Sequence, residues 1–235
     1  QPLSDAATTQ ERLALAYGFL RSQIYIITGL VKSYFGIPGA NPSYNISWLF
    51  NNGQALRGLL LSQKTIDLDA ARKVGDALVL LQNSDGSWYE AYHWRTGAPS
   101  VLYKKIGPIS VVIRSLVHLY LSTNDSKYLE SAQKAADWMI ANRWYEQHGK
   151  GYFRYNNTDN TVSVEENSRA ILALLYLYEH ATNSKNDDYQ NKAVLIKNWL
   201  IQDMWKGPAY PYFEVGLTGY GALNTNSLER SDVQF

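Results

Sequence analysis

The sequence predicts an all-α protein, an arc or ring of helix hairpins, on three observations. Apolar residues recur at spacings of three and four in seven stretches, and no stretch alternates convincingly as a half-buried strand would. Similar helices return along the chain, with equivalent arginines at Arg57, Arg114 and Arg169. A chain of 235 residues is also long enough to bury one core. We therefore expect a single domain over residues 1–235.

The apolar spacing defines the expected helices in chain order. They cover Leu13–Leu30, Trp48–Leu61, Ala70–Leu81, Ile109–Leu121, Tyr128–Ile140, Ala170–Tyr178 and Tyr189–Trp199. Two aromatic segments, Tyr152–Tyr155 and Tyr210–Val215, are expected to be short extended pieces within loops.

After the long first helix, the remaining six pair into three hairpins. The first helix of each pair is rich in small and aliphatic residues, as a helix packed on both sides would be. The second carries a charged stripe, for example Asp125, Lys127 and Glu130, and is expected to face solvent on one side. Inner and outer layers of helices follow, which is the arrangement of an α/α toroid. We expect the three repeated arginines to make hydrogen bonds between helices.

One segment carries a resemblance to known families. The run Gln82-Asn-Ser-Asp-Gly-Ser-Trp88 resembles a motif of terpene cyclases and prenyltransferase β chains, which are α/α toroids. Residues 45–215 as a whole are more similar to the six-hairpin glycosidase and polysaccharide-lyase superfamily, as in Val164-Glu-Glu-Asn-Ser-Arg169. Cyclase and prenyltransferase chemistry is disfavoured, because the chain has no Asp-x-Asp-Asp motif and no cysteine for zinc.

The hairpin count is smaller than the resemblance implies. Three hairpins and one extra helix make half of a six-hairpin ring. The molecule is then a smaller ring, an arc, or a fragment incomplete at its C-terminal end. An open arc exposes apolar helix faces, so the expectation includes a homo-oligomer or a partner subunit that completes the ring.

The loops at the two ends of the hairpins differ in length and in their content of aromatic residues. The loops at 34–46, 83–107, 143–164 and 205–222 hold 11 of the 18 tyrosines and 4 of the 7 tryptophans. The links at the opposite end are short, polar and free of aromatic residues. Aromatic side chains stack well on sugar rings, and long loops on a rigid scaffold commonly carry binding sites. We expect function on the long-loop face.

Composition excludes several classes of function. A net charge of +1 gives no reason to expect nucleic acid or an anionic membrane as partner. The chain lacks cysteine and has no histidines at the spacing of metal ligands, which argues against a metal site. It also lacks a nucleotide-binding motif, which argues against a nucleotide cofactor. No apolar run reaches the roughly 20 residues that cross a bilayer. The chain begins without an initiator Met, and we expect an extracellular or periplasmic location.

The resemblance implies a carbohydrate-active protein, first of all a glycoside hydrolase acting on a polysaccharide or oligosaccharide. Such hydrolysis needs two carboxyl groups. The catalytic candidates are Glu90, Glu165 and Asp85, although Asp85 also suits a turn before Gly86. Glu166 is assigned to structure, because Ser163 and Glu166 fit a capping box.

Substrate contacts are expected from the aromatic and polar side chains of the long loops. The candidates are Trp88, Tyr92, His93, Trp94, Arg95, Tyr152 and Tyr212. Tyr92 or His93 as base, with Arg95 as cation, would instead suit a polysaccharide lyase or uronate epimerase. A third alternative is a non-catalytic glycan-binding or assembly subunit.

Overall fold

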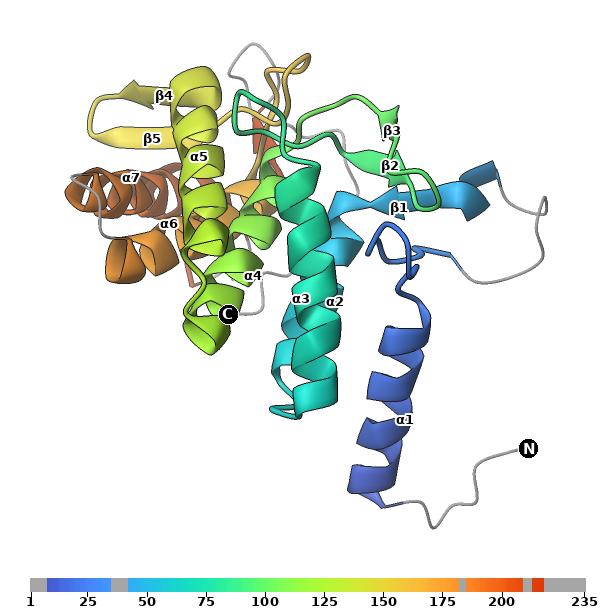
Figure 1. The fold of residues 1–235 in the computed structure, drawn as a ribbon. Helices are drawn as coiled ribbons and strands as arrows, with labels where there is room; N and C mark the ends of the chain where they lie inside the picture. The colour runs from blue at the N-terminus through green and yellow to red at the C-terminus, as the bar shows by residue number, and fades with distance from the viewer. Residues whose placement is uncertain (1–7, 35–41, 182–184, 209–212, 218–235) are drawn as a thin grey trace.

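The computed structural model describes residues 8–34, 42–181, 185–208 and 213–217, and within them the all-α prediction is confirmed (Figure 1). The helices are α1 (Thr9–Ser22), α2 (Leu49–Leu60), α3 (Thr65–Leu80), α4 (Ile106–Thr123), α5 (Ser126–Arg143), α6 (Val164–His180) and α7 (Asn186–Trp199). A four-residue 3-10 turn, Pro42–Asn45, precedes α2, and one π-helical turn, Leu200–Met204, extends α7. The last six helices form the three expected hairpins.

The hairpins build two layers. Helices α2, α4 and α6 lie side by side in the inner layer, and α3, α5 and α7 cover them from outside (Figure 1). Helix α4 packs against α2, α5 and α6, and twelve of its 18 residues are buried. Its length and apolar composition alone would suit a membrane span, but two thirds of it is buried inside this fold. Burial in the core therefore accounts for its composition.

Short strands cluster at one end of the helices (Figure 1). They are β1 (Ile46–Trp48), β2 (Ala91–His93), β3 (Pro99–Val101), β4 (Trp144–Gln147), β5 (Lys150–Phe153), β6 (Val162–Ser163) and β7 (Gly216–Leu217). One of them, β5, overlaps the extended segment predicted at Tyr152–Tyr155, and the first three residues of the segment predicted at Tyr210–Val215 lie outside the described residues. The sequence did not predict the other strands. All pairs are antiparallel, in the orders β1-β2-β3, β4-β5 and β6-β7. Strands β1 and β6 run directly into α2 and α6, and β3 is followed closely by α4. The long-loop face therefore lies at the amino ends of the inner helices.

The first helix departs from its prediction. It ends at Ser22 rather than continuing to Leu30, and the chain then reverses so that Ile24 pairs with Val31. The reversal requires a residue with positive φ, which Gly29 supplies at 73°, and a side chain there would collide with the Lys73 carbonyl. No residue of α1 is buried, so nothing in the core extends the helix.

Candidate active site at the amino ends of the inner helices

Helices α4 and α6 meet through a glutamate. The carboxylate of Glu166, in the first turn of α6, accepts a hydrogen bond from the backbone N–H of Gly107 in the first turn of α4. No side chain of α4 itself caps this amino end. Any side chain at position 107 would occupy the space of the Glu166 carboxylate. Glycine there makes the contact between the two helices possible.

The environment of Glu166 favours its protonated form. Only 9% of the side chain is exposed, and burial raises the pKa of the carboxyl to about 7. The Gly107 N–H and the positive charge of Arg169 oppose that shift but do not cancel it. Glu166 can therefore hold and release a proton near neutral pH.

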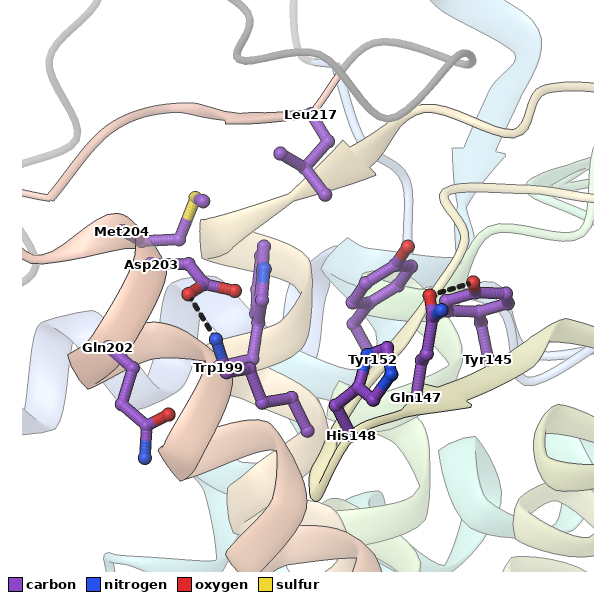
Figure 2. Close-up of a pocket in the computed structure, with 10 residues that line it drawn as sticks. Tyr145, Gln147, His148, Tyr152, Trp199, Gln202, Asp203, Met204 and Leu217 are labelled. Atoms are coloured by element: carbon purple, nitrogen blue, oxygen red, sulfur yellow. Dashed lines mark hydrogen bonds and ion pairs between the residues drawn. The ribbon is translucent and has the colours of Figure 1, made fainter.

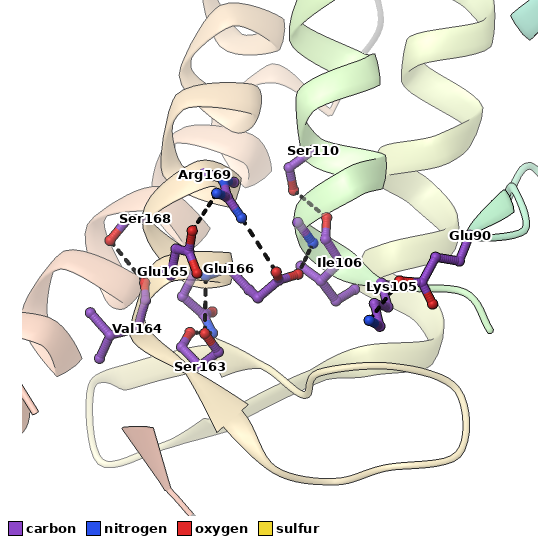
Figure 3. A network of polar contacts seen from close by, with 12 residues as sticks. Glu90, Lys105, Ile106, Ser110, Ser163, Val164, Glu165, Glu166, Ser168 and Arg169 are labelled. Atoms are coloured by element: carbon purple, nitrogen blue, oxygen red, sulfur yellow. Dashed lines mark hydrogen bonds and ion pairs between the residues drawn. The ribbon is translucent and has the colours of Figure 1, made fainter. Parts of the chain in front are cut away.

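Arg169 joins Glu166 to Glu165 (Figure 3). Its guanidinium lies 3.4 Å from the Glu166 carboxylate on one side and contacts the Glu165 carboxylate on the other. The same guanidinium lies over the ring of Phe50 from α2, 4.8 Å from its centroid. The Glu165 side chain is 59% exposed. Two neighbouring carboxyl groups thus differ sharply, one enclosed and one open to solvent.

Only half of the predicted capping box forms. The Ser163 hydroxyl accepts from the Glu166 N–H at 3.3 Å, as expected of an N-cap. The Glu166 side chain reaches across to α4 instead of back to Ser163. Sequence reasoning set Glu166 aside as a local cap, although the Gly107-Pro108 pair at the start of α4 signalled a crowded helix end.

Glu90 lies in a second ion pair of this face (Figure 3). Its carboxylate is 2.6 Å from the Lys105 ammonium, and only 11% of the side chain is exposed. Burial disfavours the Lys105 charge, but hydrogen bonds to Glu90 and Tyr155 outweigh it and raise the lysine's pKa. The backbone N–H of Leu49, which begins α2, also donates to the Glu90 carbonyl. Glu90 is therefore a fixed, ion-paired residue rather than a solvated loop glutamate.

Asp85 has the turn geometry that its sequence suggested. It accepts from the backbone N–H of Ser87 at 3.0 Å and pairs with Lys104 at 2.6 Å. Partial burial raises its pKa, but the hydrogen bonds from Lys104 and Ser87 prevail and leave the pKa below its usual value. An acid held ionised in this way is unsuited to donating a proton.

Three of the predicted sugar contacts are core residues. Trp88, Tyr92 and Trp94 are at most 4% exposed, so they present no face to a ligand. The Trp88 indole N–H donates to the Leu78 carbonyl at 2.7 Å. The Tyr92 hydroxyl accepts from Tyr89 N–H at 3.0 Å, and burial raises its pKa, which removes it as a base near neutral pH. The aromatic loop folds down onto the helices and fills the core.

The other predicted contacts are spread over the face. His93 is exposed at the end of β2, and the Arg95 guanidinium lies 4.6 Å from the centroid of the Trp94 ring. Tyr212 lies outside the described residues. Within residues 8–34, 42–181, 185–208 and 213–217, no group of three or more His, Asp or Glu side chains could hold a metal ion.

Tyr152 lines a cavity of about 730 Å³ between the β4-β5 hairpin and the end of α7 (Figure 2). Its ring stacks on Tyr145 at 5.1 Å and tilts against Trp199 at 5.3 Å. Lys150 and Asp203 form an ion pair of 2.6 Å in its wall. The remaining lining residues are Gln147, His148, Gln202, Met204 and Leu217. Mixed aromatic and hydrogen-bonding walls of this kind suit a sugar ring.

Comparisons with known proteins agree on the fold. No family model and no curated protein matches the chain. Among solved structures, the family 8 endoglucanase of Klebsiella pneumoniae matches at TM-score 0.67 and 14% identity, covering 92% of this chain and 67% of that one. The cellobiose 2-epimerase of Spirochaeta thermophila matches at TM-score 0.67 and 15% identity, covering 93% and 61%. The GH76 α-mannanase of Bacteroides thetaiotaomicron matches at TM-score 0.63 and 18% identity, covering 92% and 56%.

These matches confirm the predicted resemblance to the α/α-toroid, six-hairpin glycosidase-like fold. The structural neighbours are glycoside hydrolases, epimerases and isomerases, and identities of 11–18% show the fold alone. The chain spans 56–67% of the length of the three neighbours named above. The comparisons therefore show the fold that the chain shares with these enzymes, and no reaction.

Proposed function

We propose that the chain acts on glycans as a glycoside hydrolase, with the amino ends of α4 and α6 as its reaction centre. The observation that carries the proposal is the buried Glu166 carboxyl, whose pKa of about 7 keeps it partly protonated where most carboxyl groups are ionised. Glycoside hydrolysis requires such an acid next to an ionised carboxylate.

Each carboxyl group takes a separate role. Glu166 protonates the glycosidic oxygen as the bond to the sugar carbon breaks. Glu165, exposed and paired with Arg169, takes a proton from the water that attacks the sugar carbon. Glu90 is assigned a positioning role, because its carboxylate holds Lys105 at the start of α4. Tyr152 and its cavity supply a further contact for the glycan chain.

The test is release of new reducing ends from a panel of neutral and acidic polysaccharides. We expect Glu166→Gln and Glu165→Gln to lose activity by about a hundredfold or more, the usual cost of losing a general acid or base. Glu179→Gln is the matched control, because Glu179 lies at the opposite end of α6 with a 62% exposed side chain. Activity should also fall above pH 7 as Glu166 loses its proton.

The other readings have distinct signatures in the same assay. Ultraviolet-absorbing products would assign a lyase, and altered sugars without cleavage would assign an epimerase, with His93 the exposed candidate base. Binding without turnover would leave a glycan-binding subunit. Full activity in Glu166→Gln would overturn the proposal.

A further inference from the structure

The repeated arginines lie on the inner face of α2, α4 and α6, and two of them form part of a cationic cluster. We define this cluster as Arg57, Arg114, His118, Tyr176 and His180. The Arg114 guanidinium lies 5.1 Å from the centroid of the Tyr176 ring, and His118 contacts the same ring at 4.7 Å. Tyr176 in turn contacts His180 at 6.4 Å. One aromatic ring from α6 thus organises the basic groups of α4 and α6.

His180 lies 3.8 Å from the carboxylate of its neighbour Glu179, but the two arginines of the cluster have no acidic partner among the residues that the structure describes. Arg169 binds both Glu165 and Glu166, whereas no carboxylate of the described ranges lies within ion-pair distance of Arg57 or Arg114. The Nε atoms of Arg57 and Arg114 are buried and have no hydrogen-bond acceptor in the described part of the chain. The expected hydrogen bonds between helices are therefore not made by these two groups.

The basic groups repel one another. Burial lowers the pKa of Arg57, and the charge of Arg114 lowers it further. Burial, together with Arg57, Arg114 and His180, lowers the pKa of His118 to about 4, so that its imidazole is neutral at pH 7. Like charges held together and buried donors left unpaired both cost free energy. An anion bound here would remove both costs.

We propose that Arg57 and Arg114 bind an anionic group of an acidic glycan, either the carboxylate of a uronic acid or a sulfate ester. A guanidinium offers paired N–H donors that match the two oxygens of a carboxylate or sulfate. Arg114 is seven residues beyond Gly107 in α4, about 10.5 Å along the helix from the Gly107–Glu166 contact at 1.5 Å per residue. The anionic group would therefore belong to a sugar other than the one being cleaved.

This inference names the substrate class and rests on the proposed function for the statement that the ligand is a glycan. Binding is measured by calorimetry with trigalacturonic acid, glucose 6-sulfate and neutral maltotriose. We expect one or both acidic probes to bind and maltotriose to bind more weakly. Arg57→Gln/Arg114→Gln should weaken acidic binding by about tenfold or more, the usual cost of charge-assisted hydrogen bonds.

Two variants serve as controls. Arg72→Gln changes an arginine of the outer helix α3, where Arg72 pairs with Asp69 in solvent, and should leave binding unchanged. Arg57→Lys keeps the charge but loses the paired donors, so it should weaken carboxylate binding while the protein melts at the wild-type temperature. A melting curve of the double variant separates loss of binding from loss of folding.

The outcomes separate this inference from the proposed function. Glu166→Gln should keep acidic binding and lose cleavage. Cleavage without acidic binding, or equal binding by the wild type and the double variant, would overturn the anion site and leave the hydrolase. Self-association that the double variant abolishes would show that the face takes a second copy, and would also overturn it.

Discussion

At the scale of single residues, burial separates two adjacent glutamates. Glu165 and Glu166 share a helix turn and an arginine partner, yet only Glu166 is enclosed beneath the start of α4. Desolvation penalises its charged form more than Arg169 and the Gly107 N–H stabilise it. Sequence reasoning selected Glu165 because the predicted cap claimed Glu166 instead. It could not detect the burial of Glu166, because Gly107 is 59 residues away in the chain.

Glu166 should make the folded state less stable as pH rises. Its folded-state pKa of about 7 exceeds the unfolded value of about 4.3, so the folded chain binds more protons between these values. The free energy of unfolding should therefore fall from about pH 4.3 to about pH 7 on account of this group. Urea denaturation across that range should show that the free energy of unfolding falls less steeply with pH in Glu166→Gln than in the wild type. Glu165→Gln should keep the wild-type slope, and an unchanged slope in Glu166→Gln would contradict the assignment.

At the scale of elements, the periodic apolar pattern located every hairpin helix, but the sequence did not predict how the aromatic loops pack. The Asp85-Gly86-Ser87-Trp88 turn folds onto α5, and the Gln82 side chain donates to the Gly86 and Ser131 carbonyls at 2.8 Å each. That docking drives Trp88 into the core. The pattern of aromatic residues indicated a surface for sugars, because composition does not reveal which way a loop folds.

Gly86→Ala tests this docked turn. Gly86 has φ of 91°, and a side chain there would collide with the Lys134 carbonyl of α5. We expect a loss of about 1–3 kcal/mol in the free energy of unfolding, from backbone strain and displacement together. Gly149→Ala is the matched control, because Gly149 has φ of 73° but no atom near its would-be side chain. Equal losses at both positions would show that the collision contributes nothing.

At the scale of the whole molecule, stability is distributed unevenly across the arc. Helix α4 is enclosed by α2, α5 and α6, whereas α1 has no buried residue and exposes Leu13, Leu15 and Phe19. The ion pair between Arg21 and Asp67 joins α1 to α3. A helix with few buried contacts opens without the rest of the fold.

Hydrogen exchange followed by mass spectrometry should resolve this difference. Amides of α1 should exchange at least about a hundredfold faster than those of α4, since local opening costs far less than global unfolding. The covered outer helix α5 should exchange at a rate closer to that of α4. Protection of α1 equal to that of α4 would mean that its apolar face is covered in solution, as a partner subunit would do.

The sequence alone determined the six hairpin helices, their pairing, the inner and outer layers and the end that carries the long loops. These depend on local periodicity and on repeats, both of which are written along the chain. Only the tertiary structure decided that Trp88, Tyr92 and Trp94 belong to the core and that Glu166 spans two helices. It also decided that Arg57 and Arg114 have no acidic partner within the part of the chain that it describes. The contact of Glu166 with Gly107 joins residues 59 positions apart, and the direction in which an aromatic loop folds depends on the helices it meets, so no sequence period reports either.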